Sequence, residues 1–247
     1  MKTNQKTHHF RLSLSAVAAL LLFPCCGDSS EQAIEELISQ DVISSAMDVK
    51  SGIGFKALFD AVMENDTATL KLLLDAGADA NAKLDDGITA LMSASVRGHD
   101  TCVKLLLDAG ADADAKEDIK NMTALMSASV NGHDSCVKLL LDAGADTEAK
   151  AKGGETALMV ASAKGHDACV KLLLDAGADA DAKEKRGMTA LMGACWEGHD
   201  TCVKLLLDAG ADANAKVDER GITALRVASK NGHDACVKLL KAAGARE

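Results

Sequence analysis

Hydrophobic residues recur with a helical period in short segments along most of the chain. In the segment that starts at Asp100, the apolar residues Cys102, Val103, Leu106 and Leu107 occupy positions i, i+1, i+4 and i+5. This spacing places the four side chains on one face of a helix. The segment therefore predicts a short amphipathic helix that opens at Asp100 and ends before the glycine at position 110.

A second apolar segment, residues 90–97, precedes this helix. It follows Thr89, and threonine is a favourable residue at the N-cap of a helix. Gly98 comes directly after the segment, and glycine commonly ends a helix in the left-handed conformation. The two segments together predict a pair of short antiparallel helices.

This pair of segments is repeated along the chain. The tetrad Thr-Ala-Leu-Met begins at positions 89, 123, 156 and 189, Thr-Ala-Leu-Arg begins at 223, and a degenerate copy begins at Lys56. The residue two before each tetrad is glycine, or Asn121 in one copy. Both residue types tolerate a positive φ, so we expect a turn there in every copy, including the first at Gly54. Identical strings at a period of 33 or 34 residues indicate a solenoid built from one unit.

The chain divides into three parts on this basis. Residues 54–247 form the array, with repeats at about 54–86, 87–120, 121–153, 154–186, 187–220 and 221–247. Residues 28–53 contain Ile34, Leu37, Ile38 and Val42 at helical spacing, which predicts an amphipathic helix followed by a linker. This helix either caps the first repeat or serves as a tether. Residues 1–27 have a different composition and form a leader.

The leader has the pattern of a secretory signal. Lys2, Lys6 and Arg11 occur without an acidic residue and precede an apolar run over residues 12–23, which is too short for a comfortable bilayer span. Cys25 and Cys26 follow, and this arrangement resembles the lipidation site of bacterial lipoproteins, although Phe and Pro replace the usual small residues. We expect an exported protein that is periplasmic, lipid-anchored or secreted. Lipidation at either cysteine, ordinary cleavage near residue 27 and an uncleaved anchor remain alternatives.

The repeat resembles the ankyrin repeat. The resemblance rests on the 33-residue period, the Thr-x-Leu tetrad, the Gly-His step, the Leu-Leu-Leu run and Gly-Ala-Asp, and it covers residues 54–247. It implies an all-α solenoid of six helix-turn-helix repeats with short β-turn or hairpin connections, and a module that binds proteins on its concave surface. Ala replaces the usual Pro of the tetrad, and Met replaces the usual His, so a thioether packs at that position. In the last repeat Arg226 and Lys241 replace apolar residues, as expected for the polar outer face of a terminal repeat.

The composition supports helices and restricts the partners. Aromatic residues make up 2% of the chain and hydrophobic residues 48%, so the apolar residues are mainly Ala, Leu, Val and Met, which favours helices over sheets. The net charge of −10 argues against nucleic acid and against an anionic membrane surface as partners. We therefore expect a monomer without a cofactor, which contacts a membrane only through an N-terminal lipid anchor.

Histidine and cysteine are the residues that could carry metal or catalytic chemistry. They form five pairs one helical turn apart: His99 with Cys102, His133 with Cys136, His166 with Cys169, His199 with Cys202 and His233 with Cys236. A zinc site needs four ligands that converge at about 2.0–2.3 Å, whereas stacked helices lie roughly 8–10 Å apart. We interpret these cysteines as core residues, and we expect no metal site and no catalytic residue in a motif copied five times.

Two further sets of residues could carry a disulfide or a metal ion. Cys195 lies on the first helix of the repeat that contains Cys202, which leaves open whether these two thiols form a disulfide. The runs Asp112-Ala-Asp114 and Asp179-Ala-Asp181 are similar to calcium loops but lack the third acid and the central glycine of an EF-hand. We interpret the acidic runs as a solvated edge.

The positions that differ between repeats carry the functional signal. With ankyrin geometry, the two residues before each Gly-His step face the concave surface, and the residue before each tetrad lies near the turn. The predicted partner-binding residues are therefore Val96, Arg97, Val130, Asn131, Ala163, Lys164, Trp196, Glu197, Lys230, Asn231, Ile88, Met122, Glu155, Met188 and Ile222. Trp196 is the single tryptophan of the chain, and tryptophan is enriched among binding hot spots.

These observations predict an exported, non-enzymatic protein that binds an unidentified partner protein on its concave face. One alternative is a periplasmic or surface protein that buffers metal or redox state through the Cys/His ladder. The other is a structural spacer with an inert concave face. Accessibility of the thiols distinguishes the buffering protein from the binding module.

Overall fold

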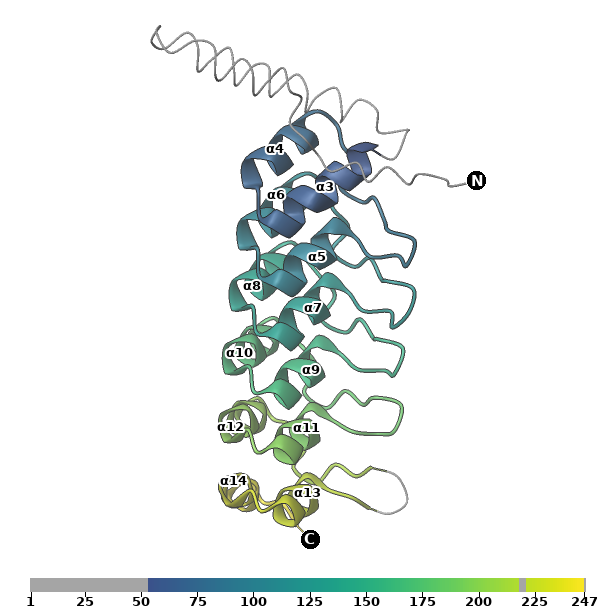
Figure 1. The fold of residues 1–247 in the computed structure, drawn as a ribbon. Helices are drawn as coiled ribbons and strands as arrows, with labels where there is room; N and C mark the ends of the chain where they lie inside the picture. Colours follow the sequence, from purple (N-terminus) through teal and green to yellow (C-terminus); the bar gives the residue numbers. More distant parts are fainter. Residues whose placement is uncertain (1–52, 218–220, 247) are drawn as a thin grey trace, which may run out of the picture.

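The computed structural model describes residues 53–217 and 221–246, in which six pairs of helices are stacked in one row (Figure 1). The first helices of the pairs are α3 (Ile53–Glu64), α5 (Ala90–Arg97), α7 (Ala124–Asn131), α9 (Ala157–Lys164), α11 (Ala190–Glu197) and α13 (Ala224–Asn231). The second helices are α4 (Thr67–Asp75), α6 (Asp100–Asp108), α8 (Asp134–Asp142), α10 (Asp167–Asp175), α12 (Asp200–Asp208) and α14 (Asp234–Ala242). The predicted all-α ankyrin-repeat solenoid is confirmed. The leader with Cys25 and Cys26, and the predicted amphipathic helix before residue 53, lie outside the described residues.

Local sequence signals set the bounds of the helices. The hydroxyl of Thr89 accepts a hydrogen bond from the backbone N–H of Met92 at 3.2 Å, and Gly98 ends α5 with φ 72°. The expected turn before the tetrad is present at Asn121, with φ 54°, but the expectation is wrong at Gly54, which lies inside α3. Lys56 replaces the capping threonine in that copy, so no N-cap stops the helix from extending back to Ile53.

The hydrophobic core lies between the layer of first helices and the layer of second helices. Helix α5 packs against α7 and α6 packs against α8, and the same neighbours meet along the whole array. Cys102, Val103 and Leu106 of α6 are fully buried, as their spacing predicts. Leu91 and Met92 of α5 are buried on the facing side, so the methionine of the tetrad is a core residue as expected.

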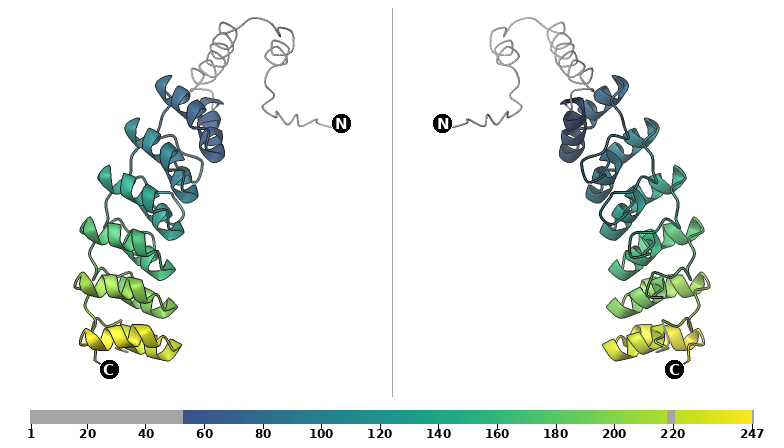
Figure 2. Two further views of the ribbon diagram at one scale, coloured as in Figure 1. Left: turned by 90° about the vertical axis from the view of Figure 1, so that its left-hand side faces the viewer. Right: turned by 90° about the vertical axis from the view of Figure 1, so that its right-hand side faces the viewer.

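Long loops connect the pairs and project on one side of the array (Figure 1). Within the described residues their strand-like content is limited to two isolated antiparallel bridges, Lys83 with Thr89 and Val217 with Ile222. We call these loops the hairpins. Figure 2 shows the stacked pairs from two sides, with the row bent along its length.

The last repeat presents a polar end. Arg226 is exposed where the four preceding repeats bury methionine, and Ser229 is exposed where Cys195 of the preceding repeat is buried. Lys241 is exposed as well, so α13 and α14 show the polar outer face predicted for a terminal repeat. None of the described helices has the length and apolar character required to span a membrane.

Candidate functional site

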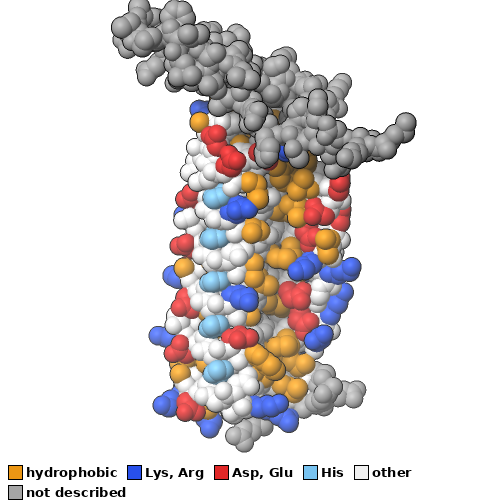
Figure 3. Space-filling model, viewed as in Figure 1, with side chains coloured by type: hydrophobic (Ala, Val, Ile, Leu, Met, Phe, Trp, Pro, Cys, Tyr) orange, Lys and Arg blue, Asp and Glu red, His pale blue; other side chains and the backbone are white. Residues whose placement is uncertain are grey.

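The first helices and the hairpins line one long face of the array, which we call the concave face (Figure 3). A row of histidine side chains follows the array, and an apolar stripe runs beside it toward the hairpins (Figure 3). Val96 and Trp196 are the most exposed apolar residues among the predicted binding residues, at 48% and 54%. The stripe offers an apolar surface that extends across several repeats.

The structure places the predicted binding residues at the surface to different degrees. The residues directly before each Gly-His step, namely Arg97, Asn131, Lys164, Glu197 and Asn231, are all exposed. The residues before them are exposed at Val96, Trp196 and Lys230 and half-buried at Val130 and Ala163. The residues before each tetrad, namely Ile88, Met122, Glu155, Met188 and Ile222, are half-buried. These placements agree with the expected geometry, and the binding role of each residue stays a prediction.

Trp196 combines a fixed backbone with an exposed ring. It lies in the last turn of α11, and its carbonyl oxygen accepts hydrogen bonds from Nδ2 of Asn231 and Nε2 of His233, both at 3.0 Å. The next repeat therefore holds this backbone in place while the residue remains 54% exposed. Such a side chain is pre-organised for contact with a partner.

The histidine row has a structural role that the sequence reasoning missed. The His133 ring packs over Gly98 of the preceding repeat, where a Cβ atom would lie 2.5 Å from Nδ1. Nε2 of His133 donates to the carbonyl oxygen of Val96 at 3.0 Å, and Nε2 of His166 donates to that of Val130 at 3.1 Å. The constant pairing of glycine with histidine in the sequence is the signal that could have revealed this inter-repeat contact.

The first histidine of the row departs from this pattern. Asn65, with φ 56°, takes the place of the glycine in the first repeat, and its Oδ1 accepts a hydrogen bond from Sγ of Cys102 at 3.3 Å. Among the described residues, Nε2 of His99 is buried without a hydrogen-bond partner. This burial lowers the pKa of His99, and the charge of Arg97 lowers it further.

The repeat cysteines are inert core residues. Cys102, Cys136, Cys169, Cys195, Cys202 and Cys236 are buried and free, so Cys195 and Cys202 are not bridged. Burial raises the pKa of the Cys136 and Cys169 thiols to about 11 and that of Cys195 to about 12. A thiol with such a pKa stays protonated at neutral pH, and protonated buried thiols are poor nucleophiles and poor metal ligands. The described residues include no group of three or more His, Cys, Asp or Glu side chains placed to hold a metal ion.

The acidic runs at the base of the hairpins connect successive repeats. Oδ1 of Asp112 accepts a hydrogen bond from the backbone N–H of Asp114, whose own Oδ1 accepts one from the N–H of Asp146. The same inter-repeat bond joins Asp181 to the N–H of Asp212 at 2.7 Å. These carboxylates serve as hydrogen-bond acceptors that keep the loops in register, which adds a structural role to the predicted solvated edge.

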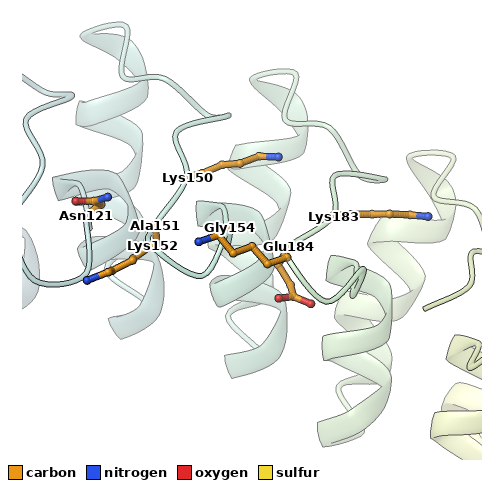
Figure 4. A pocket seen from close by; sticks show the side chains of 8 residues that line it. Asn121, Lys150, Ala151, Lys152, Gly154, Lys183 and Glu184 are labelled. Atoms are coloured by element: carbon orange, nitrogen blue, oxygen red, sulfur yellow. The ribbon is translucent and has the colours of Figure 1, made fainter. Parts of the chain in front are cut away.

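The hairpin tips are also joined to one another. The backbone N–H of Lys152 donates to the carbonyl of Lys120 at 2.7 Å, and that of Lys185 donates to the carbonyl of Gly153 at 3.0 Å. A shallow hollow of about 350 Å³ lies between these tips, and Lys150, Lys152, Lys183 and Lys185 contribute to its lining (Figure 4). Glu184 also lines this hollow. The hairpins therefore form a continuous border to the concave face in the middle of the array, and four lysines and one glutamate line the hollow between their tips.

Comparisons with known proteins describe the same repeat. The family model for "Ankyrin repeats (3 copies)" matches residues 58–151 and 148–217. The chain is similar to the crystal structure of an ankyrin repeat domain from Acinetobacter baumannii AYE, with 32% sequence identity and a TM-score of 0.71. This similarity covers 76% of the chain and 98% of that domain. No curated protein matches the sequence.

Proposed function

The chain belongs to the ankyrin-repeat family, and on this premise we propose that it is an exported, non-catalytic protein that binds a partner protein on its concave face. Ankyrin repeats are in general protein-interaction modules, but the fold alone identifies no partner. The proposal therefore rests on the particular side chains of this concave face.

The exposed ring of Trp196 is the observation that carries the proposal. At the equivalent position other repeats carry Val96, Val130, Ala163 or Lys230, so the fold does not require an aromatic side chain there. A large ring that is 54% exposed gains little in the free protein, whereas its burial against a partner contributes strongly to affinity. An apolar stripe bordered by charged side chains also has the usual anatomy of a protein interface.

Export is the second part of the proposal, and it rests on the leader sequence alone. The basic start, the short apolar run and Cys25-Cys26 are typical of a cleaved signal. The mature protein is expected to begin between Cys25 and Asp28. If either cysteine is lipidated, substitution of both converts a membrane-bound protein into a soluble one, whereas an intact Met1 on cytosolic protein would contradict export.

The two alternatives have less support. Buffering of metal or redox state requires accessible thiolates, and the six described cysteines are buried with no thiol pKa lowered. A spacer with an inert concave face gives no reason for the exposed Trp196.

Affinity capture from the native compartment tests the proposed function. The wild-type protein and the Trp196→Ala variant are used as parallel baits, and the retained proteins are quantified by mass spectrometry. A true hot spot contributes at least about 2 kcal/mol, so we expect a specific partner to be retained by the wild type and reduced roughly 30-fold with the variant. The melting temperature of the variant should be nearly unchanged. Unfolding of the variant with unchanged capture would contradict the placement of the binding face.

A further inference from the structure

The charged side chains around Trp196 indicate the chemistry of the partner. Lys164 ends α9 beside Ala163, the equivalent of Trp196 in the preceding repeat, and Lys230 occupies the position of Trp196 in the next repeat. Lys185 and Arg186 lie in the hairpin that leads into α11, before the start of the helix that ends with Trp196 and Glu197. All four cations are exposed. This concentration of positive charge contrasts with the net charge of −10 of the whole chain.

These cations are not neutralised by ion pairs within the described residues. The ion pairs there are Lys104 with Asp108, Lys138 with Asp142 and Lys171 with Asp175, all on second helices. None of them includes a cation beside Trp196. The cations of the concave face are therefore available to an incoming partner.

The nearby acids are largely engaged in their own loops. Oε1 of Glu184 accepts hydrogen bonds from the backbone N–H groups of Arg186 and Met188, at 2.9 and 3.1 Å. The carboxylate of Glu155 lies over Gly153 of the same hairpin. Glu197 directly follows Trp196 in α11 and is exposed. These carboxylates keep their negative charge, so the four cations and three acids together carry a net charge of +1, in contrast to −10 for the whole chain.

The fold does not require positive charge at these positions. In the first hairpin, Asp85 and Asp86 stand where Lys185 and Arg186 stand in the fourth, each pair directly before a glycine with positive φ. The same loop therefore accommodates either sign of charge. Backbone hydrogen bonds from Lys152 and Lys185 fix the hairpin tips, so the hairpin charges stand at defined places along the concave face.

We propose that the part of the concave face around Trp196 recognises an acidic segment of the partner protein. An apolar side chain of the segment covers the indole, and carboxylates on either side contact Lys164, Lys185, Arg186 and Lys230. Complementary charge of this kind sets the orientation of a partner and speeds its association. The inference rests on the proposed function, because it names the partner chemistry of the same face.

The test uses two fluorescein-labelled peptides and the full chain. One peptide has Leu-Phe flanked on both sides by Asp and Glu, and the other has the same Leu-Phe flanked by Lys and Arg. The test variant carries Lys185→Asp and Arg186→Asp, which reproduces the charges of the first hairpin. The control variant carries Lys138→Asp and Lys171→Asp on the second helices and has the same total charge. Fluorescence anisotropy gives the affinity at low and high salt.

We expect the acidic peptide to bind the wild type and the control variant with similar affinity, and the test variant about tenfold more weakly. Its affinity should also fall with added salt because exposed charges are screened. Equal or tighter binding of the basic peptide, or no binding of the acidic one, would overturn the inference. If Trp196→Ala weakens binding of both peptides while the charge reversal changes the binding of neither, the concave face is still the binding face. In that case only the proposal that the partner segment is acidic is wrong. If neither change has an effect, the proposed function fails as well.

Discussion

The carbonyl oxygen of Trp196 lies 3.0 Å from Nε2 of His233, one repeat further along the chain. The same contact joins Val96 to His133 and Val130 to His166, so three histidines of the row fasten the ends of α5, α7 and α11 to the next repeat. At Trp196 this fastening fixes the residue that presents the largest exposed apolar ring of the concave face. The histidine row therefore helps to hold the proposed binding residue Trp196 in place.

The histidine contact predicts unequal effects of two equivalent substitutions. His133→Ala removes a hydrogen bond and the ring that packs over Gly98, and we expect it to lower the free energy of unfolding by about 1–3 kcal/mol. His99→Ala should have a smaller effect, because Nε2 of His99 has no partner among the described residues. Urea denaturation followed by circular dichroism measures both. Equal losses would show that the hydrogen bond contributes little.

Two glycines of the third repeat predict different losses of stability when each is replaced by alanine. Gly132 and Gly144 have φ of 73° and 86°, so alanine at either position adopts a left-handed conformation that costs about 1–2 kcal/mol. A Cβ atom at Gly132 would also lie 2.5 Å from Nδ1 of His166, whereas at Gly144 it would meet no atom within 4 Å. We expect Gly132→Ala to lower the melting temperature clearly more than Gly144→Ala. A similar decrease for both would mean that the His166 ring moves aside without loss.

Two buried serines predict different effects of alanine substitution on the stability of the fold. Oγ of Ser162 has no hydrogen-bond partner among the described residues, so Ser162→Ala should leave the stability unchanged or raise it. Oγ of Ser95 donates to the carbonyl of Leu91 at 2.7 Å, and Ser95→Ala should lower the stability by about 0.5–1.5 kcal/mol. Thermal unfolding of the two variants gives the comparison. A larger loss for Ser162→Ala would reveal a partner for its hydroxyl.

The buried thiols predict a loss of stability at alkaline pH. Burial raises the pKa of Cys136 and Cys169 from 9.0 to about 11 in the folded protein, so the folded state holds these protons at pH values where the unfolded state releases them. Stability from this source is therefore complete below pH 9 and decreases as the pH rises toward 11. The slope of unfolding free energy against pH over this range should become smaller in the Cys136→Val, Cys169→Val variant. An unchanged slope would show that the thiols titrate normally in the folded state.

The parts of the structure that depend on local sequence could be predicted. Thr89, Gly98 and the apolar spacing around Cys102 determine the bounds and the buried face of each helix, because capping and periodicity act within a few residues. The exposed positions of the concave face followed from the repeat register, which is the same in each copy.

The features that depend on contacts between repeats could not be predicted in the same way. The hydrogen bond from His133 to Val96 spans 37 positions, and no pattern within a single repeat shows which atoms meet. The helical conformation of Gly54 depends on the missing cap at Lys56, and a rule drawn from the other repeats missed it. The hydrogen bond from Sγ of Cys102 to Oδ1 of Asn65 likewise arises from two repeats packed together.

The central claim is that Trp196 becomes buried when the concave face binds its partner. Because Trp196 is the single tryptophan, growth with 5-fluorotryptophan gives the protein one ¹⁹F resonance that the partner does not share. We expect this resonance to shift when the partner recovered by affinity capture is added, and to become shielded from a solvent-borne paramagnetic reagent at saturation. A resonance that keeps its position and its solvent exposure in the saturated complex would contradict the account.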